Sequence, residues 1–172
     1  TQIVTTPIIP KIVGDELKAS EKFWVKKKKC IFCDILQKER TSARLIIEND
    51  GFVVLAPWAS VHPFEFWIFP ENHQPTLLAM SQRDVASLAK TIRICFGGLR
   101  TLLSDPPYNF GFHIAPRRKS KKYYHWHLEV YPRLAMWAGL EKSSGIFINT
   151  VLPEDAATSL REAFLAEEKR MQ

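Results

Sequence analysis

The spacing of apolar residues predicts a long helix near the middle of the chain. Between about residues 82 and 104, apolar side chains recur every three or four positions, as on one face of a helix: Val85, Leu88, Ile92, Cys95, Phe96, Leu99 and Leu102. We expect this stripe to be buried, with Cys95 as a core residue. A weaker helical pattern covers residues 12–27. The segment PED at 153–155, with proline in a first turn, predicts a last helix.

Shorter apolar runs between turn residues predict an antiparallel sheet. The runs ARLIIEN and GFVVLAP flank Asn49-Asp50-Gly51, which predicts a β-hairpin. Further strands are expected at FEFWIFP (64–70), FGFHIA (110–115), HWHLEVYP (125–132) and GIFINTV (145–151). Strands in hairpin order with a few helices indicate an α+β domain with a mostly antiparallel sheet and packed helices.

Polar and apolar residues alternate in the segment HWHLEVYP. Alternation places His125, His127 and Glu129 on one face of the strand, together with Tyr131, while Trp126, Leu128 and Val130 take the other. The ordinary interpretation is a sheet with one solvated face. Two histidines and a glutamate on one face are, however, the residue types that bind metals or carry catalysis, so we expect a site here.

Length and composition narrow the class of protein. A chain of 172 residues with 46% hydrophobic content predicts a single globular domain with a substantial core. It has no apolar run of about 18 residues, so no membrane-spanning helix is expected. The opening TQIVTTPIIP lacks the regions of a signal peptide. With only three cysteines as well, these features favour a reducing, cytoplasmic location.

The net charge of +6 is concentrated in two basic runs, KKKK at 26–29 and RRKSKK at 117–122. Such runs are most often solvated loops or helix ends. The functional alternatives are attraction of a phosphorylated substrate or of nucleic acid.

The pair Cys30-x-x-Cys33 is a weak signal by itself, compatible with redox chemistry, metal binding or coincidence. Structural zinc takes four cysteine or histidine ligands in a tetrahedron, and histidines 73, 113, 125 and 127 are available. Spacing alone does not select two of them. Because the surroundings lack the βαβ pattern of thioredoxin-like proteins, metal binding is favoured over redox chemistry.

Several motifs in the same order resemble the C-terminal half of the galactose-1-phosphate uridylyltransferase family and of the related ADP-sugar phosphorylases, in the histidine-triad superfamily. They are CIFCDI, ENDGFVVLAPWASVHPFEFWIFPENH, DPPYNFGFHIAP, YYHWHLEVYPRL and GIFINTVLPEDAA. The resemblance covers essentially the whole chain. It implies that residues 30–172 form a C-terminal histidine-triad-like domain. Residues 1–29 would hold the end of a preceding half and a connecting helix.

The resemblance also implies which residues bind metal. A zinc ion would be held by Cys30, Cys33, His73 and His125. Some family members bind a second metal at positions matching Glu16, His113, His127 and Glu129, although the last is a histidine there. For His127 we keep three interpretations open: structural hydrogen bonding, a ligand of that second metal, and a nucleophile.

The family nucleophile lies in a His-Pro-His-x-Gln motif, and TQIVTTPIIP resembles its tail. The chain also lacks an initial methionine, which suggests a fragment of a longer protein whose nucleophilic histidine precedes Thr1. That histidine would form a covalent nucleotidyl intermediate, while Gln2 would donate a hydrogen bond to a phosphoryl oxygen. Glutamine at this position favours transfer over hydrolysis. The 172-residue chain alone is therefore expected to be inactive.

The implied function is that of a hexose-1-phosphate nucleotidyltransferase of the UDP-glucose:galactose-1-phosphate uridylyltransferase type. Its partners would be a nucleotide sugar, a hexose 1-phosphate and a second subunit of a homodimer, rather than nucleic acid or a membrane. Glu141 and Asn149 are the candidate sugar contacts, although AMWAGL before Glu141 departs from the family pattern. The alternatives are an ADP-sugar or dinucleoside polyphosphate phosphorylase, and a non-catalytic zinc-stabilised module that binds a nucleotide or nucleic acid.

Overall fold

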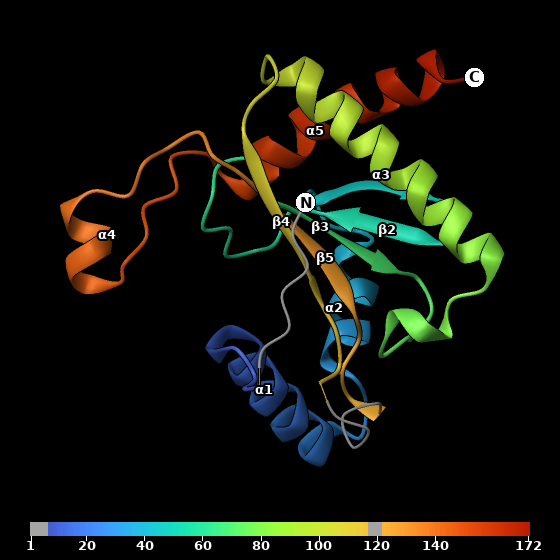
Figure 1. Cartoon of the computed structure of the whole chain (residues 1–172), viewed down its shortest axis with the longest axis vertical. Helices are drawn as coiled ribbons and strands as arrows, with labels where there is room; N and C mark the ends of the chain where they lie inside the picture. The colour runs from blue at the N-terminus through green and yellow to red at the C-terminus, as the bar shows by residue number, and fades with distance from the viewer. Residues whose placement is uncertain (1–6, 117–121) are drawn as a thin grey trace.

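The structure is a computed structural model, and it describes residues 7–116 and 122–172. In this part, the chain forms an antiparallel sheet flanked by helices. The elements are α1 (Lys11–Lys27), α2 (Ile31–Glu39), β1 (Leu45–Asn49), β2 (Phe52–Leu55), β3 (Phe66–Pro70), the 3-10 turn η1 (Leu77–Ala79), α3 (Gln82–Leu102), β4 (Tyr108–His113), β5 (His127–Pro132), α4 (Gly139–Ser144) and α5 (Pro153–Arg170). The predicted α+β class is confirmed (Figure 1).

The strands are ordered β1-β2-β3-β5-β4, and all neighbours are antiparallel. The predicted hairpin joins β1 to β2 through Asp50 and Gly51, whose φ angles of 46° and 88° lie in the left-handed region. Positive φ at both turn residues matches the twist of paired strands, which is why Asp-Gly favours this turn. The strand expected at 125–132 begins at His127. Strand β5 lies between β3 and β4, so His127 lies in the interior of the sheet, and His125 immediately precedes the strand.

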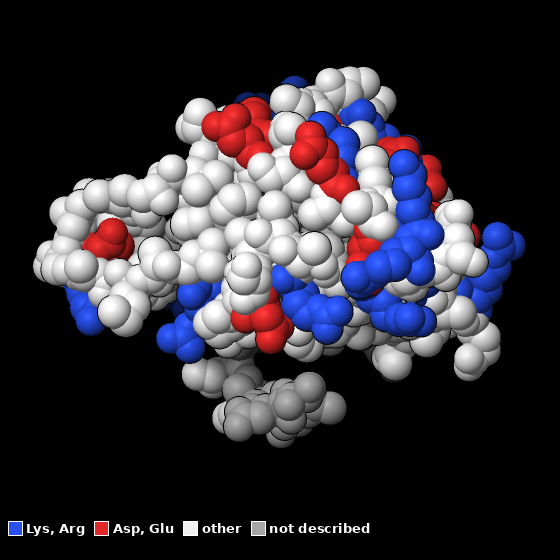
Figure 2. Space-filling view, turned by 90° about the horizontal axis from the view of Figure 1, so that it is seen from above, with Lys and Arg blue, Asp and Glu red and all other residues white. Residues whose placement is uncertain are grey.

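Helices α3 and α5 cover one face of the sheet (Figure 1). Leu128 and Val130 of β5, and Trp126 just before it, belong to the same core as Leu99 and Phe164. The two helices approach closely at Gly98, where an added Cβ would lie 2.5 Å from the Phe164 ring. Figure 2 shows both acidic and basic side chains on this end of the molecule, so the positive charge does not gather there into one basic face.

The apolar stripe of α3 is buried only in part. Leu88, Cys95 and Leu99 are buried as predicted, but Val85 is 49% exposed. Val85 lies in the first turn of α3, at the end of the helix that is farther from α5 (Figure 1). Periodicity identified the correct helical face but did not show where the packing partner ends.

Helices α1 and α2 lie on the opposite face of the sheet (Figure 1). Phe32 and Leu36 of α2 form a second core with Phe69 of β3 and with Tyr124, and Leu17 of α1 packs against it. The polar face of β5 is therefore covered, and His125, His127 and Glu129 are buried. The solvated-face interpretation of HWHLEVYP is wrong, because two helices that lie far from it in sequence cover it.

Residues 133–152 leave the sheet as an arm that carries α4 (Figure 1). The strand expected at 145–151 does not form, since this segment is the returning limb of the arm and pairs with no strand among the described residues. Asn149 instead ties it to the β2–β3 connection by donating to the carbonyls of Ser60 and His62. None of the described helices is long and apolar enough to cross a membrane.

Candidate functional site

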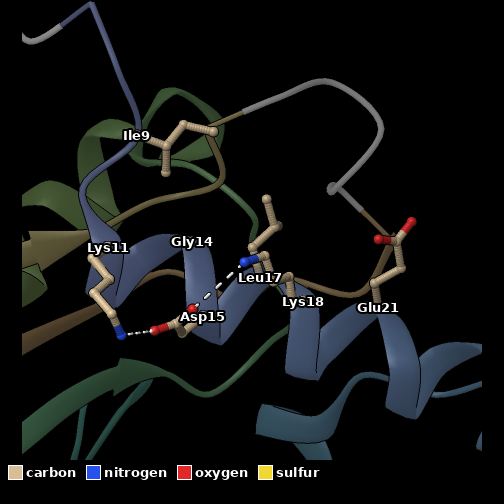
Figure 3. Close-up of a pocket in the computed structure, with 7 residues that line it drawn as sticks. All are labelled: Ile9, Lys11, Gly14, Asp15, Leu17, Lys18 and Glu21. Atoms are coloured by element: carbon tan, nitrogen blue, oxygen red, sulfur yellow. Dashed lines mark hydrogen bonds and ion pairs between the residues drawn. The ribbon is translucent and has the colours of Figure 1, made fainter.

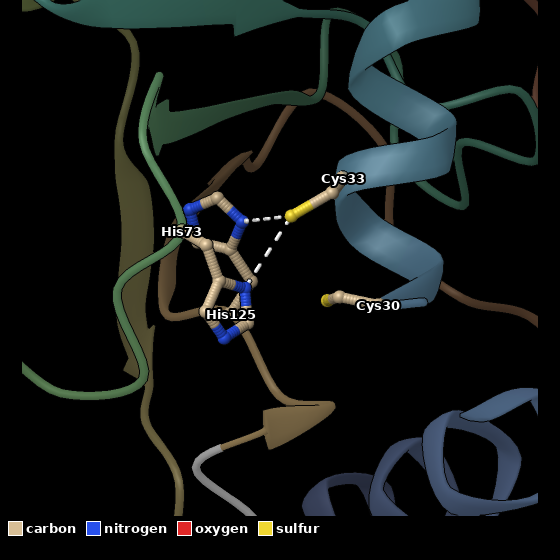
Figure 4. A group of neighbouring side chains, drawn as sticks. All are labelled: Cys30, Cys33, His73 and His125. Atoms are coloured by element: carbon tan, nitrogen blue, oxygen red, sulfur yellow. Dashed lines mark hydrogen bonds between the residues drawn. The ribbon is translucent and has the colours of Figure 1, made fainter. Parts of the chain in front are cut away.

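Cys30, Cys33, His73 and His125 come together at the start of α2 (Figure 4). Their ligand atoms all lie within 4.8 Å of one another. The Cys33 sulfur is 3.3 Å from Nδ1 of His73 and 3.5 Å from Nδ1 of His125. Two thiols and two imidazoles at this spacing are the donor set of a tetrahedral structural zinc site.

Local backbone geometry places the two cysteines. Helix α1 ends at Lys27, and the next residue, Lys28, adopts the left-handed conformation with φ 57° and turns the chain toward α2. Cys30 then takes the extended conformation of an N-cap, and Cys33 lies in the first turn of α2. The two histidines come from loops at the sheet, one after β3 and one before β5. One ion at this point would join α2 to both loops.

The two thiols shift each other's pKa in opposite directions. A hydrogen bond from the Cys33 thiol lowers the pKa of Cys30 to about 5, with a smaller contribution from His73 and against the effect of burial. The same interaction, together with burial, raises the pKa of Cys33. Burial, followed by the charges of His73 and His127, lowers the pKa of His125 to about 3. A thiolate and a neutral imidazole are the protonation states that bind metal.

A second group is formed by Glu16 of α1, His113 of β4, and His127 and Glu129 of β5. Nδ1 of His113 lies 3.1 Å from both oxygens of Glu16 and 3.4 Å from Oε1 of Glu129. Nε2 of His127 lies 3.0 Å from Oε1 of Glu129 and 3.9 Å from Oε1 of Glu16. Four ligand atoms therefore converge on one point from three elements.

The protons in this group can be assigned in part. Nδ1 of His127 lies 3.1 Å from the carbonyl oxygen of His125, which can only accept, so this nitrogen carries a hydrogen. In the neutral ring, Nε2 then presents a lone pair to the Glu129 carboxylate. Two acceptors at hydrogen-bond distance require a proton or a metal cation between them.

The outer oxygens of both carboxylates are held by tyrosines. Tyr124 donates to Oε2 of Glu16 at 2.7 Å, and Tyr131 donates to Oε2 of Glu129. Burial alone would lower the pKa of His113, but the two glutamates outweigh it and raise that pKa. Burial alone would raise the pKa of Glu16, but His113, His127 and Tyr124 lower it. The arrangement stabilises positive charge, whether a proton or a metal ion, among the four groups.

The ring of His127 is enclosed by aromatic side chains. Its centroid lies 4.9 Å from those of Phe32 and Phe69 and 5.2 Å from that of Trp67. The residue is fully buried, and both ring nitrogens already face partners. This favours the structural and metal-ligand interpretations of His127 over the nucleophile interpretation.

The structure shows no contact between the two candidate sugar-binding residues. The Glu141 carboxylate accepts a hydrogen bond from the backbone of Ala138 and caps α4. The Asn149 amide donates to two loop carbonyls and accepts from the backbone of Val151. Gln2, the predicted phosphate contact, lies outside the described residues, as does most of the basic run 117–122.

A pocket of about 460 Å³ at the base of the arm contains residues that the sequence did not single out. Arg133 and Lys142 line it together with Asn109, Trp137 and His62, whose ring stacks on the Trp137 indole at 5.5 Å. The described part of the chain offers neither cation an acidic partner. Two unpaired cations beside aromatic rings suit a phosphorylated ligand. In the sequence, this pocket could have been suspected from the basic residues Arg133 and Lys142, which lie on either side of LAMWAGLE.

A further hollow of about 360 Å³ lies along α1 (Figure 3). Lys11 and Lys18 both line it, and both turn to Asp15, at 2.6 and 3.7 Å. Because its lysines already pair with a carboxylate beside them, we assign no ligand to it.

Comparison with known proteins shows the family to which the chain belongs. The profile "Galactose-1-phosphate uridyl transferase, C-terminal domain" matches residues 16–144, which include the cysteine pair, all five histidines and α4. The chain belongs to the galactose-1-phosphate uridylyltransferase family. The fold expected from the resemblance is thereby confirmed.

Relatives within the uridylyltransferase family include two kinds of enzyme. The chain is 30% identical to an ADP-glucose phosphorylase of Arabidopsis thaliana, over 96% of this chain and 47% of that protein. It is 31% identical to a galactose-1-phosphate uridylyltransferase of Thermotoga maritima, over 94% of this chain and 53% of that protein. The chain thus spans about half the length of the curated relatives it matches.

Solved structures agree with this assignment. A uridylyltransferase structure matches with a TM-score of 0.86 and 30% identity, covering 93% of this chain and 52% of that chain. An Arabidopsis thaliana ADP-glucose phosphorylase with bound ADP-glucose gives a TM-score of 0.83 at 30% identity, covering 91% and 51%. A zinc-bound histidine triad protein of Mycobacterium smegmatis, at 22% identity and a TM-score of 0.57, shares the fold alone.

Proposed function

We propose that this chain is the C-terminal half of a cytoplasmic hexose-1-phosphate nucleotidyltransferase of galactose metabolism. The observation that carries the proposal is the family match over residues 16–144 in a chain that spans about half of its relatives. Residues 30–172 form the second histidine-triad-like half, and residues 1–29 connect it to the first. The first half supplies the histidine that takes the nucleotide from UDP-glucose, and Gln2 contacts its phosphoryl oxygens.

A difference between the two edges of the sheet supports the proposal that another half of the protein packs against this one. The β1 edge is covered, because the Arg161 guanidinium of α5 donates to the carbonyls of Ala43 and Leu45. At the opposite edge, β4 presents exposed Tyr108, Phe110 and Phe112 and has no further strand beside it among the described residues. Soluble proteins rarely leave an apolar sheet edge unprotected. Strand β4 is where we place the sheet of the first half.

Cys30, Cys33, His73 and His125 hold one structural zinc ion in this proposal. The support is their donor chemistry, their mutual spacing and the thiolate and neutral imidazole forms already favoured there. A structural zinc ion fixes its ligands and contributes its binding free energy to folding. Here it would fix the start of α2 relative to the loops before β5 and after β3. The chemistry of nucleotidyl transfer does not pass through it.

The hexose 1-phosphate is proposed to bind at the arm. Arg133 and Lys142 pair with its phosphate, and Glu141 accepts hydrogen bonds from sugar hydroxyls with the carboxylate oxygen that does not cap α4. Asn149, proposed as a second sugar contact, has its amide engaged with the loop backbone. Its first role is therefore to hold the arm in place, and a sugar contact would add to that role.

A homodimer completes the proposal. Met136 is 93% exposed and Trp137 46% exposed, on an arm that projects from the sheet (Figure 1). Burial against a partner subunit would stabilise each by about 1.5–3 kcal/mol. The arm would then contribute to a cleft shared with that subunit.

An ADP-sugar phosphorylase is the second candidate, favoured by the 30% identity to the Arabidopsis thaliana enzyme. The two candidates differ in the acceptor of the nucleotide. The test is to supply the longer protein with UDP-glucose plus galactose 1-phosphate, and separately with ADP-glucose plus inorganic phosphate. Formation of UDP-galactose supports the uridylyltransferase. Formation of ADP and glucose 1-phosphate with the second pair alone contradicts it and supports the phosphorylase.

A further inference from the structure

His62 lines the pocket at the base of the arm together with Arg133 and Lys142. It comes from the connection between β2 and β3, whereas the two cations follow β5 in the chain. It belongs to neither candidate metal group and does not cap α4. The proposed function therefore leaves an imidazole without a role beside the two cations proposed to bind a phosphate.

The backbone of His62 is held from both sides. The buried Glu65 carboxylate accepts from the backbone N–H groups of Val61 and His62 at 2.8 and 3.0 Å. The other oxygen of Glu65 accepts from the Trp67 indole at 2.9 Å. The Asn149 amide donates to the His62 carbonyl at 3.3 Å. These contacts fix the point at which the imidazole enters the pocket.

Aromatic contacts set the plane of the His62 ring. It stacks on the Trp137 indole with ring centroids 5.5 Å apart and an interplanar angle of 21°, and it tilts against the Tyr131 ring at 5.4 Å and 56°. Within the described part of the chain, neither nitrogen of the ring has a hydrogen-bond partner. A partly buried imidazole that is held by its two faces can therefore offer its nitrogens to a ligand in the pocket.

The carboxylates nearest in the fold are engaged elsewhere. Glu65, on the same connection, accepts from backbone N–H groups and an indole, and Glu129 of β5 accepts from the Tyr131 hydroxyl. Strand β4 contributes the uncharged Asn109 to the pocket. A negative charge that stabilises a protonated His62 ring has to come from a ligand.

Without a bound ligand, the His62 ring is expected to be neutral at pH 7, because burial lowers its pKa below the ordinary 6.5. A phosphate monoester is mostly dianionic above about pH 6. A negative charge beside an imidazole favours the protonated ring. Binding of a phosphate in the pocket would therefore raise the pKa of His62.

We propose that His62 is a third ligand of the phosphate at the arm, neutral in the free protein and protonated when a phosphate monoester is bound. This inference rests on the proposed binding of hexose 1-phosphate there. The proton comes from solvent, so that both ring nitrogens carry hydrogens and one donates to a phosphate oxygen. Binding takes up a proton, and affinity falls as the pH rises from the pKa of the free ring to that of the ring in the complex.

Calorimetric titration of the 172-residue chain with galactose 1-phosphate tests the proposal, in two buffers whose own heats of protonation differ. The variant is His62→Phe, which keeps a ring for the aromatic contacts and removes both nitrogens. The unmodified chain should take up more protons per ligand near pH 7 than His62→Phe. It should also bind about tenfold more tightly than the variant near pH 6.5, the scale of one charge-assisted hydrogen bond. This advantage should shrink at about pH 8.5.

Arg133→Gln is the matched control. Because arginine stays charged throughout this pH range, its loss should weaken binding by a similar factor at both pH values and leave the proton uptake in place. Circular dichroism checks that both variants keep the fold. The carbon-13 resonance of the His62 ring, identified by its loss in His62→Phe, should titrate at a higher pH with galactose 1-phosphate than without it.

The proposal is overturned if the chain does not bind galactose 1-phosphate, if His62→Phe takes up as many protons as the unmodified chain, or if their affinity ratio is the same at both pH values. Production of UDP-galactose by the longer protein, with a KM profile against pH that His62→Phe leaves unchanged, would contradict the role of His62 but support the transferase. Proton-coupled binding without UDP-galactose formation would contradict the transferase and support His62 as a phosphate ligand.

Discussion

His125 and His127 lie two positions apart, His125 just before β5 and His127 at its first residue, yet each belongs to a different group. Nδ1 of His125 faces Cys33, whereas Nε2 of His127 faces Glu129. Alternation along HWHLEVYP correctly predicted the shared face. It could not divide the histidines between two groups, because Cys33 comes from α2 and Glu16 from α1, and the crossing of these helices over the sheet is a tertiary property. The ligand sets came from family resemblance.

The cysteine–histidine group gives a prediction about single residues. The chain should contain about one zinc ion, and Cys33→Ser should remove most of it and lower the melting temperature, because the metal's binding free energy contributes to folding. Elemental analysis of the purified chain, with a thermal melt, measures both.

Cys95→Ala is the matched control, since Cys95 is buried in the other core and distant from this group. It should keep its zinc even if the cavity it leaves lowers the melting temperature. Zinc content unchanged by Cys33→Ser would exclude this ligand set.

At the scale of elements, the sequence predicted the long helix and the hairpin but not the arm or the short helices. Periodicity predicted α3, and the hairpin turn followed from Asp50-Gly51. The apolar run at 145–151 resembles a strand in composition, but a strand also needs a neighbour, and the arm provides none. The short helices α2 and α4 span 9 and 6 residues, too few for a helical period to show clearly.

The start of α3 gives a prediction about one element. Ser81 accepts from the backbone of Asp84, and the Asp84 carboxylate accepts from the backbone of Ser81. Ser81→Ala should lower the free energy of unfolding by about 1 kcal/mol. Urea denaturation measures the change, with Ser143→Ala on the exposed arm helix as a control that should have little effect.

The same capping box predicts a pH dependence. The hydrogen bond from the Ser81 backbone lowers the pKa of Asp84 below its ordinary 3.8. A carboxyl group whose pKa is lower in the folded state stabilises the fold above its unfolded pKa, and this effect is lost as pH falls through the folded pKa. Asp84→Asn should therefore destabilise the chain at pH 7 but progressively less below pH 3.8. A constant difference between the two proteins across this range would contradict the assignment.

The arm gives a prediction about substrate binding. In the longer protein, Lys142→Ala should raise the KM for hexose 1-phosphate, because it removes one of two cations from the pocket proposed to bind the phosphate. Steady-state kinetics with the nucleotide sugar held constant measures it. Lys90→Ala, on an exposed position of α3, is the control, and an equal effect of both variants would show a general change of charge instead.

At the scale of the whole molecule, the exposed arm and the open β4 edge are two separate surfaces. In the proposal, the β4 edge contacts the first half of the longer protein and the arm contacts a second subunit. Light scattering of the longer protein at micromolar concentration should therefore give a dimer, and Trp137→Ser should weaken it. If the unmodified protein and Trp137→Ser are both monomeric and equally active, a shared cleft is excluded.

The central claim is that the nucleophile lies outside this chain and that the histidines within it serve structure or metal binding. Incubation with UDP-glucose labelled in the uridylyl group, followed by peptide mapping, tests it most directly. The longer protein should carry the label on a histidine of its first half, and the 172-residue chain should carry none. A labelled adduct on His127 would contradict the account.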